Sequence, residues 1–280
     1  MPKEVIVSTY IAPLTRLGSP ELVLDSLKEA GFSYYDFSMM FPILGFDLIY
    51  DSEKHIERAS SFRKYADSLN MYCNQTHGAV PCFKKDNSEE ENKLLFNRLK
   101  KTIEVSGILG AKYCVLHPVC DCTMEENINF FNSLTGIAKE NNVVIAIENT
   151  LSNKLFGKPN DFIELFKHLD DNHFKVCLDI GHSEVNNVGS SAIEFIEKLK
   201  DKIVCLHIHD NDKITDSHQL PFSLVIQFEP IFKALKNSGY KGDITFECGS
   251  YFDNMPVSLF VDALKFLYKV GVYIGNKVFD

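Results

Sequence analysis

Short apolar segments alternate with longer amphipathic segments along the whole chain. The short segments have the length of a strand, and most are apolar without a break, which is typical of strands covered on both faces. The longer segments carry helix start and stop residues: Ser19 and Pro20 open one of them, and Gly31 closes it. We predict strands at residues 4–8, 34–37, 71–75, 113–116, 143–147, 174–178, 203–206 and 243–246.

The amphipathic segments complete a repeated unit of one strand and one helix. Eight strands and eight helices in strict alternation, at 280/8 = 35 residues per unit, favour a closed (β/α)8 TIM barrel over an open sheet. No segment has the composition of a linker, so we predict an α/β fold with a single domain over residues 1–280. We predict helices at residues 19–30, 52–70, 88–109, 123–142, 160–169, 190–200, 228–239 and 256–270.

The composition excludes several classes of protein. Hydrophobic residues make up 45% of the chain, charged residues 24%, and the mean hydropathy is −0.08, which are ordinary values for a globular protein. No apolar run approaches the ~18 residues of a membrane helix, and the first residues lack the features of a secretion signal. We therefore expect a cytoplasmic protein with no membrane partner, whose eight cysteines are free thiols. A net charge of −9 disfavours nucleic acid as a partner.

Side chains able to bind a metal follow six of the predicted strands. They are 40, 31, 31, 28 and 40 residues apart, which matches the repeat of one strand and one helix. Each therefore falls at the C-terminal end of its strand, the rim on which barrels build active sites, and we expect all six to converge on one pocket. The residues are His77, His117, Glu148, Asp179, His207 and Glu247.

Three carboxylates and several imidazoles in one pocket indicate a divalent cation. Like charges a few ångströms apart cannot all stay ionised unless something neutralises them. Carboxylate oxygen together with imidazole nitrogen suits Mn²⁺, Zn²⁺, Co²⁺ or Mg²⁺. Each residue taken alone has a structural explanation, as a hydrogen-bonded histidine or as a carboxylate that caps a helix. Six of them at the spacing of the repeat favour the metal.

The order of these motifs resembles the xylose isomerase-like TIM-barrel superfamily. That superfamily contains sugar and sugar phosphate isomerases and epimerases, inosose dehydratase-like enzymes and the endonuclease IV class of DNA-repair enzymes (AP endonuclease family 2). The most specific part of the resemblance is Asp179-Ile180-Gly181-His182 followed by His207-Ile208-His209-Asp210 and the terminal Glu247. The segments that carry it are 110–117, 147–149, 178–182, 206–210 and 244–247.

The resemblance implies roles for individual residues. In the epimerase branch it assigns the metal to Glu148, Asp179, His207 and Glu247, with the two glutamates also acting as acid and base. His182 looks like the histidine that contacts the substrate or a further metal, and it is a catalytic candidate. His209, two residues after His207, is the alternative ligand from that segment; we favour His207 because the other ligands directly follow an apolar run.

Endonuclease IV adds ligands for two further metals, and the side-chain types of these ligands are present here. His77 and His117 match its early histidines, and Asp216-Ser217-His218 resembles its later Asp-x-His segment. However, His117 is followed by Pro118-Val119-Cys120-Asp121 where that enzyme has Pro-Gly-Ser-His. With His182, these residues are either additional metal ligands or the lining of a sugar pocket. We expect His77, His117, His182 and His218 to contact the substrate.

We therefore expect a metal-dependent isomerase or epimerase of a sugar, sugar phosphate or polyol-ketone. The cation would hold adjacent oxygens of a small carbohydrate and stabilise the enediolate, while Glu148 and Glu247 carry the proton. The alternatives are an inosose dehydratase-like lyase, an endonuclease IV-like phosphodiester hydrolase, and a barrel that binds a ligand without turning it over. Arg16 and Lys84 are candidate contacts for an anionic group. The apolar residues 41–46 suggest a pocket wall or the contact of a homo-oligomer.

Overall fold

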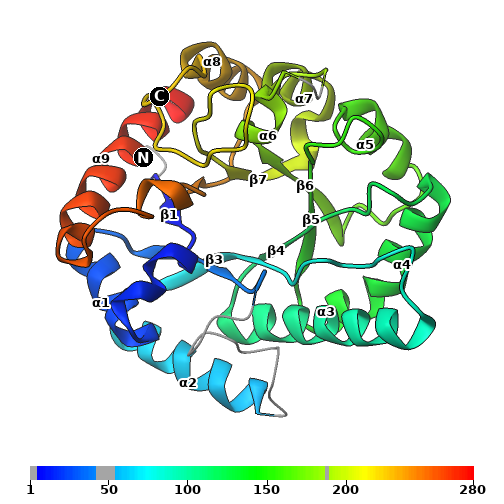
Figure 1. The fold of residues 1–280 in the computed structure, drawn as a ribbon, viewed down its shortest axis with the longest axis horizontal. Coiled ribbons are helices and arrows are strands. Elements are labelled where there is room, and N and C mark those ends of the chain that lie inside the picture. The colour runs from blue at the N-terminus through cyan, green and yellow to red at the C-terminus, as the bar shows by residue number, and fades with distance from the viewer. Residues whose placement is uncertain (1–4, 42–53, 187–188) are drawn as a thin grey trace.

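The strands of the computed structural model form a ring with the helices outside it (Figure 1). The structure describes residues 5–41, 54–186 and 189–280. Each strand is displaced by no more than about three residues from its predicted position, which is the usual uncertainty of an element boundary. The strands are β1 Val7–Thr9, β2 Tyr34–Ser38, β3 Tyr72–His77, β4 Tyr113–Leu116, β5 Val144–Glu148, β6 Phe174–Asp179, β7 Ile203–His207 and β8 Ile244–Phe246.

All of the strand pairs are parallel. Strands β2 to β7 pair in sequence order, and β1 pairs with β8. Parallel bridges between Tyr10 and Asp36 and between Ile208 and Phe246 join these two sheets at both seams. The predicted TIM barrel is therefore confirmed, with the carboxyl ends of all the strands at one end of the ring.

Helices follow the strands as predicted, and their caps are those visible in the sequence. The hydroxyl of Ser19 accepts a hydrogen bond from the Leu22 amide at the start of the first helix, and Gly31 ends it with a φ of 105°. Ser88 and Thr123 each form a capping box with the glutamate three residues later. The helices are α1 Pro20–Ala30, α2 His55–Ser68, α3 Glu89–Leu109, α4 Met124–Glu140, α5 Pro159–Leu165, α6 Ile180–Glu184, α7 Ala192–Leu199, α8 Phe228–Ser238 and α9 Phe260–Phe279.

Three helices differ from the prediction. One is α5, which ends at Leu165 although the pattern predicts a helix to residue 169. The pattern predicts that the final helix ends at residue 270, whereas α9 continues to Phe279. Gly271 and Gly275 suggest a stop, but both lie inside the helix, where a Cβ on Gly271 would overlap Val7 and one on Gly275 would overlap Val5. The glycines therefore allow close packing of α9 against the start of the barrel. The short helix α6 is not predicted, because its five residues are too few to show a helical period.

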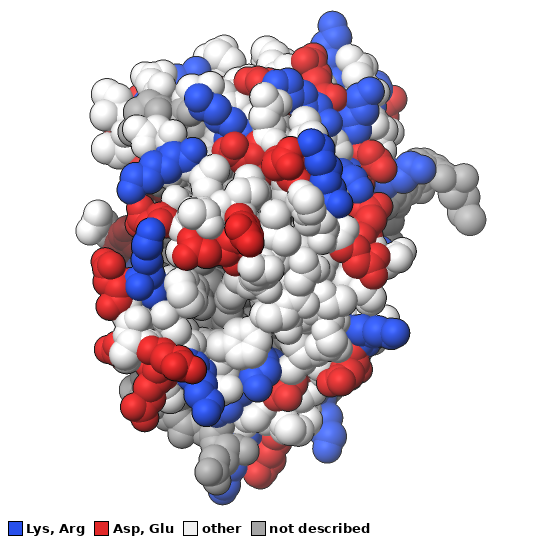
Figure 2. Space-filling view, turned by 90° about the vertical axis from the view of Figure 1, so that its right-hand side faces the viewer, with Lys and Arg blue, Asp and Glu red and all other residues white. Residues whose placement is uncertain are grey.

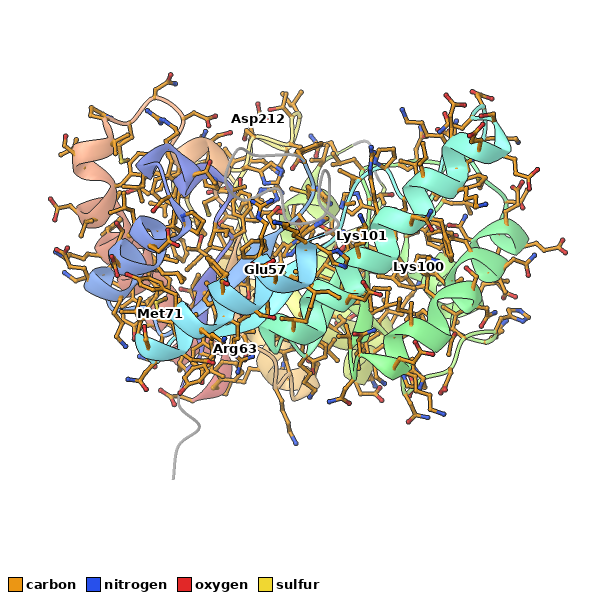
Figure 3. All side chains as sticks on the ribbon, turned by 90° about the horizontal axis from the view of Figure 1, so that it is seen from below. Glu57, Arg63, Met71, Lys100, Lys101 and Asp212 are labelled. Atoms are coloured by element: carbon orange, nitrogen blue, oxygen red, sulfur yellow. The ribbon has the colours of Figure 1, made fainter. Side chains whose placement is uncertain are left out.

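The two ends of the barrel are chemically different. In Figure 3, Asp212 in the loop after β7 lies at one end, and Met71, just before β3, lies toward the other. Near Met71, Arg63 of α2 donates to the carbonyl oxygen of Leu109 over 2.7 Å and so ties α2 to the C-terminus of α3. The end that carries Asp212 holds the strand-end residues described below.

Three further expectations from the sequence concern the cysteines, membrane-spanning helices and residues outside the described ranges. All eight cysteines are free thiols, as expected. Among residues 5–41, 54–186 and 189–280, no helix is both long and apolar enough to cross a membrane. The expected start of the second helix at residue 52, the strand start at residue 4, and residues 42–46 of the apolar segment lie outside the described residues.

Candidate metal centre

The six strand-end residues converge, as the spacing predicts. Each occupies the last position of its strand or the position just after it. His77, Glu148, Asp179 and His207 are the final residues of β3, β5, β6 and β7, and His117 and Glu247 directly follow β4 and β8.

Four of these residues form a buried group that we call the central quartet: Glu148, Asp179, His207 and Glu247. One ligand atom from each lies within 4.8 Å of the others. Nδ1 of His207 lies 3.0 Å from Oε1 of Glu148, 3.5 Å from Oε2 of Glu247 and 3.8 Å from Oδ2 of Asp179. All four residues are buried, and none exposes more than 4% of its surface.

The donor set of the central quartet fits a divalent cation. Three carboxylates removed from water are strongly unfavourable unless positive charge lies among them. Their oxygens and one imidazole nitrogen provide four ligands of the kind that Mn²⁺, Zn²⁺, Co²⁺ and Mg²⁺ accept. The residues present therefore match the group that the sequence suggests.

Neighbouring charges shift the pKa values of Glu148, Asp179 and His207 toward their charged forms. Burial raises the pKa of Glu148, but His207 and His117 outweigh it and hold the pKa well below its usual range. Burial likewise opposes the lowered pKa of Asp179, which His182 and His209 stabilise as a carboxylate. Burial lowers the pKa of His207, but Glu247 and Glu148 raise it well above its usual value. A cation among these groups would therefore displace protons.

His77 and His117 lie on one side of the central quartet. Nε2 of His77 is 3.1 Å from Oε2 of Glu148 and 3.2 Å from Nε2 of His117, which itself lies 3.0 Å from the same carboxylate oxygen. His77 is fully buried, whereas the side chain of His117 is one-third exposed. Of these two histidines, His117 is the one that a ligand in solution reaches directly.

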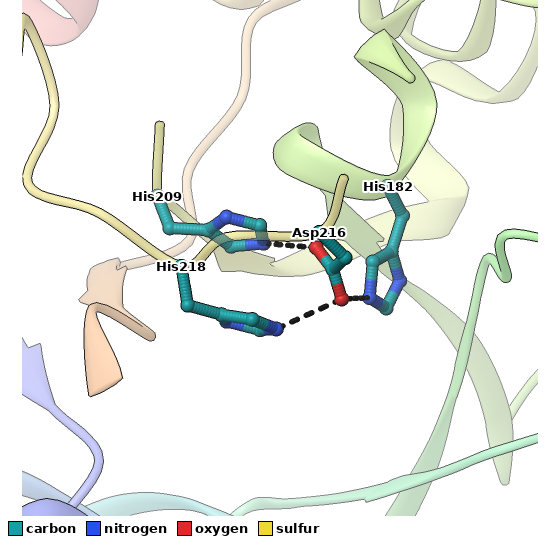
Figure 4. A group of neighbouring side chains, drawn as sticks. All are labelled: His182, His209, Asp216 and His218. Carbon is teal, nitrogen blue, oxygen red and sulfur yellow. Dashed lines mark hydrogen bonds and ion pairs between the residues drawn. The ribbon is translucent and has the colours of Figure 1, made fainter. Parts of the chain in front are cut away.

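A second group, which we call the outer cluster, lies on the other side and consists of His182, His209, Asp216 and His218 (Figure 4). Oδ2 of Asp216 lies 3.2 Å from Nε2 of His182 and 2.9 Å from Nε2 of His218. Its Oδ1 is buried without a hydrogen-bond partner among the described residues. The rings of His209 and His218 stack with centroids 4.0 Å apart. This group could also hold a metal.

Backbone carbonyl oxygens orient three histidines around the central quartet. Nδ1 of His77 donates to Gly78, that of His182 to Asn149, and that of His218 to Glu247, over 2.8 to 3.0 Å. Each ring thereby turns its Nε2 toward the neighbouring carboxylates. This is the arrangement that orients histidines which bind metals.

His207 and His209 contact different sets of carboxylates in the structure. His207 points into the central quartet, and Nε2 of His209 lies 3.1 Å from Oδ1 of Asp179 and 3.6 Å from Oδ1 of Asp216. The ring of His209 lies against Gly181, where a Cβ would overlap it. The structure therefore places His207 in the quartet and His209 beside it, and the choice of His207 as the metal ligand stays a prediction.

Several residues of the site receive no role in the sequence analysis. Asn149 binds the backbone of Asp179 twice, accepting from its N–H over 2.7 Å and donating to its carbonyl over 2.9 Å. Asp210 accepts from the amides of Leu224 and Ile226 and so organises the loop after β7. Asp36 of β2 is buried behind His207. Asn149 directly follows a predicted ligand, which is the one available signal; nothing in an apolar strand marks Asp36.

A pocket of about 900 Å³ opens beside His117 and is lined by residues 80–86, residues 117–121 and Phe41. Lys84 lies on its wall, as a contact for an anionic group requires, together with Lys85 and Asp86. Arg16 does not fit that expectation, because it donates to the carbonyl oxygens of Phe252, Asp253 and Met255. On the face shown in Figure 2, basic side chains are interspersed with acidic ones.

The fold and the site together define a TIM barrel with a cluster of carboxylates and histidines on the carboxyl ends of its strands. The family model described as xylose isomerase-like TIM barrel matches residues 24–270. The chain belongs to this family.

Relatives with curated sequences are themselves uncharacterized. Protein MJ1614 of Methanocaldococcus jannaschii is 32% identical over 193 residues, which are 66% of this chain and 71% of that protein. Protein y4fM of Sinorhizobium fredii is 30% identical over 160 residues, which are 53% of this chain and 51% of that protein. The chain thus spans about half the length of the latter relative.

Solved structures share the fold at low sequence identity. The IOLI protein with a binding zinc atom is 18% identical and has a TM-score of 0.78, over 99% of this chain and 100% of that one. A D-tagatose 3-epimerase-like protein is 20% identical and has a TM-score of 0.75, over 99% of both chains.

Proposed function

We propose that the protein is a divalent-cation-dependent isomerase or epimerase of a small carbohydrate, which is a sugar, a sugar phosphate or a polyol-ketone. The observation that carries the proposal is the pair of buried glutamates, Glu148 at the end of β5 and Glu247 directly after β8, which both lie within 3.5 Å of Nδ1 of His207. They come from different parts of the ring and border the same cation site. Two carboxylates in this arrangement can address two faces of one substrate carbon.

The residues of the central quartet have two tasks in this proposal. Glu148, Asp179, His207 and Glu247 would hold the cation, which supplies positive charge beside the substrate oxygens. One glutamate accepts the proton from the carbon next to the carbonyl group. If the other glutamate is protonated beforehand, transfer of its proton to the opposite face of the same carbon gives the epimer. Proton transfer to the former carbonyl carbon, with the hydroxyl proton moving between the two adjacent oxygens, gives the isomer.

The histidines around the quartet would bind the substrate hydroxyl groups. His117 and His218 expose 33% and 25% of their side chains, and His182 exposes 10%. An imidazole can donate or accept a hydrogen bond, which suits a polyhydroxylated ligand. His77 is only 1% exposed and lies 3.1 Å from Oε2 of Glu148, so it would contact the part of the substrate next to that glutamate. The names of similar solved structures, which include a D-tagatose 3-epimerase-like protein and a D-psicose 3-epimerase, support a carbohydrate substrate.

A panel of ketoses and inososes tests this proposal. The protein, reconstituted with Mn²⁺ or Co²⁺ in deuterium oxide, should place solvent deuterium on the carbon next to the carbonyl group of its substrate, read by NMR. Loss of water from an inosose in the same spectra would instead identify the dehydratase-like lyase. Unaltered spectra after long incubation would identify a barrel that only binds a ligand.

Replacing either glutamate of the quartet should remove turnover. Glu148→Gln and Glu247→Gln keep the side-chain shape but cannot accept the proton, so we expect turnover to fall about 10²–10⁴-fold or more. The rate of deuterium exchange measures this loss, and circular dichroism checks the fold. Glu125→Gln, on the exposed first turn of α4, is the matched control. Near-normal turnover in either quartet variant would remove that glutamate from the proton transfer.

One observation favours a second candidate, a metal-dependent phosphodiester hydrolase like endonuclease IV. Groups of potential ligands lie on both sides of the quartet: His77 with Glu148 and His207, and the outer cluster. Elemental analysis distinguishes the two functions. One bound ion per chain supports the isomerase, and three ions per chain together with cleavage of DNA at abasic sites support the hydrolase.

A further inference from the structure

A buried carboxylate lies behind the metal-binding histidine of the central quartet. Asp36 belongs to β2, a strand that contributes nothing to the quartet, and it is completely buried. Its Oδ2 lies 3.8 Å from Nε2 of His207, on the side of the ring that faces away from Glu148. None of the roles proposed above uses Asp36.

Asp36 is held in place by a hydrogen-bonded network inside the barrel. Nε2 of Gln75 donates to Oδ2 of Asp36 over 2.9 Å. Oε1 of Gln75 accepts from the hydroxyl of Thr245 over 3.3 Å, and that hydroxyl also pairs with the hydroxyl of Ser8 over 2.8 Å. The network therefore anchors the carboxylate through Oδ2, the same oxygen that lies 3.8 Å from Nε2 of His207.

His207 and Asp36 each have one buried atom without a partner. Nε2 of His207 and Oδ1 of Asp36 make no hydrogen bond within the described part of the chain. Buried polar atoms are nearly always paired, so each such atom requires an explanation. Here the two unpaired atoms belong to neighbouring side chains, which approach each other to 3.8 Å between Nε2 of His207 and Oδ2 of Asp36.

Three neighbouring histidines have the kind of hydrogen-bond acceptor that Nε2 of His207 lacks. His77, His182 and His218 each donate Nδ1–H to a backbone carbonyl and turn Nε2 toward the carboxylates. His207 is oriented the other way round, with Nδ1 toward the quartet and Nε2 toward Asp36. A ring that binds a cation through Nδ1 must carry its proton on Nε2, so Asp36 stands where the other histidines have a carbonyl.

We propose that Asp36 is a positioning residue, which holds His207 with its proton on Nε2 and the lone pair of Nδ1 directed at the cation of the central quartet. Gln75 orients Asp36 for this task. The inference concerns cation binding and does not depend on which substrate the protein turns over.

Cation affinity tests the proposal. Asp36→Asn keeps the shape of the side chain but loses the charge, and we expect the Kd for Zn²⁺, measured by competition with a chromophoric chelator, to rise about 10–100-fold. Ser8→Ala is the control, because it removes a hydroxyl of the same network that does not contact Asp36. Its Kd should stay within about twofold of the wild-type value. An unchanged Kd in a folded Asp36→Asn variant would overturn the proposal.

The protonation state of His207 provides a second readout that a merely structural role would not change. In the Zn²⁺-loaded wild-type protein, ¹⁵N NMR of labelled histidines should show His207 protonated on Nε2 and shifted by the metal on Nδ1. Asp36→Asn should alter the Nε2–H resonance, and Gln75→Leu should weaken Zn²⁺ binding to a lesser extent. A His207 protonated on Nδ1 in the loaded wild-type protein would overturn the proposal, even if Asp36→Asn does not fold.

Discussion

Individual polar residues of this site have a structural role and a chemical role at the same time. Oδ1 of Asp179 caps the short helix α6 by accepting from the backbone N–H of His182 over 2.7 Å, which leaves Oδ2 for the central quartet. The structural explanation of a carboxylate at a strand end and the metal-binding explanation are therefore compatible. The cap also brings Nδ1 of the His182 imidazole to 4.0 Å from Oδ2 of the same carboxylate. Asp179 therefore contributes its own carboxylate to the site and also positions His182.

Replacing the histidine that ends β7 and the histidine two residues later should have unequal effects. His207→Ala removes a ligand of the quartet, and we expect its Zn²⁺ affinity to fall by well over the ~10–100-fold typical of residues outside the ligand set. His209→Ala removes a contact to Asp179 and should lose no more than that range. Inductively coupled plasma analysis after dialysis measures the retained metal. Retention in His207→Ala combined with loss in His209→Ala would reverse the assignment.

The stability of the cation-free protein should depend on the protonation of His218. Burial lowers the pKa of His218, but Asp216 and Glu247 raise it to about 9. Because this folded value lies above the unfolded value of about 6.5, the stabilisation is complete below about pH 6.5 and is lost as the pH rises through about 9.

Urea unfolding after removal of metals measures this effect. The midpoint should fall between about pH 6 and about pH 9.5 in the wild-type protein, and His218→Gln should show a smaller fall. Equal falls in both proteins would show that His218 does not contribute.

At the scale of elements, the barrel depends on close contacts between the last helix and the first strand. α9 buries Leu264, Leu267, Val270 and Ile274 against the outside of the ring, and its two glycines lie where the helix approaches β1 most closely. A sequence pattern presents these glycines as a stop, since glycine disfavours a helix when it is considered alone. Packing outweighs that preference, because a larger residue would separate helix and strand.

The glycines of α9 and α4 should respond in opposite ways to substitution by alanine. A Cβ on Gly271 would overlap Val7 and contact Phe246, so Gly271→Ala should destabilise the protein by about 1–3 kcal/mol. Gly136 of α4 is exposed and has no atom nearby, so Gly136→Ala should stabilise by about 0.5–1 kcal/mol. Urea unfolding midpoints measure both changes. A Gly271→Ala protein as stable as the wild type would show that α9 can shift without cost.

At the scale of the whole molecule, the ring brings together side chains that are far apart in sequence. Glu148 and Glu247 are separated by 99 residues, yet both lie within 3.5 Å of Nδ1 of His207. The quartet takes its residues from β5, β6 and β7 and from the position after β8, and these segments belong to both sheets. A cation bound there would therefore connect the two sheets.

Cation binding should consequently stabilise the folded protein. At a free Zn²⁺ concentration of about 100 times Kd, the gain is about 2.7 kcal/mol, provided that the unfolded chain does not bind the ion. The thermal midpoint, followed by circular dichroism, should rise by several degrees and return when EDTA is added. Glu247→Gln should show little of this rise, and Glu125→Gln should show all of it. An equal rise in Glu247→Gln would place the stabilising ion elsewhere.

The sequence by itself determined the barrel and the ring of residues on its rim. Apolar segments at a regular interval predict parallel strands, and the carboxyl ends of such strands must meet at one end of the barrel. The spacing alone therefore identifies the rim residues His77, His117, Glu148, Asp179, His207 and Glu247.

Only the tertiary structure decided which histidines lie in the central quartet and which in the outer cluster. His207 and His209 are two positions apart, and the sequence favours His207 only because it directly follows an apolar run. In the structure, the ring of His209 lies against Gly181 and between Asp179 and Asp216. The pairing of Asp36 with His207 also depends on side-chain directions across the ring. A periodic pattern shows which residues lie at the end of a strand. The orientation of an imidazole ring depends on neighbours from other strands, and the pattern carries no information about these neighbours.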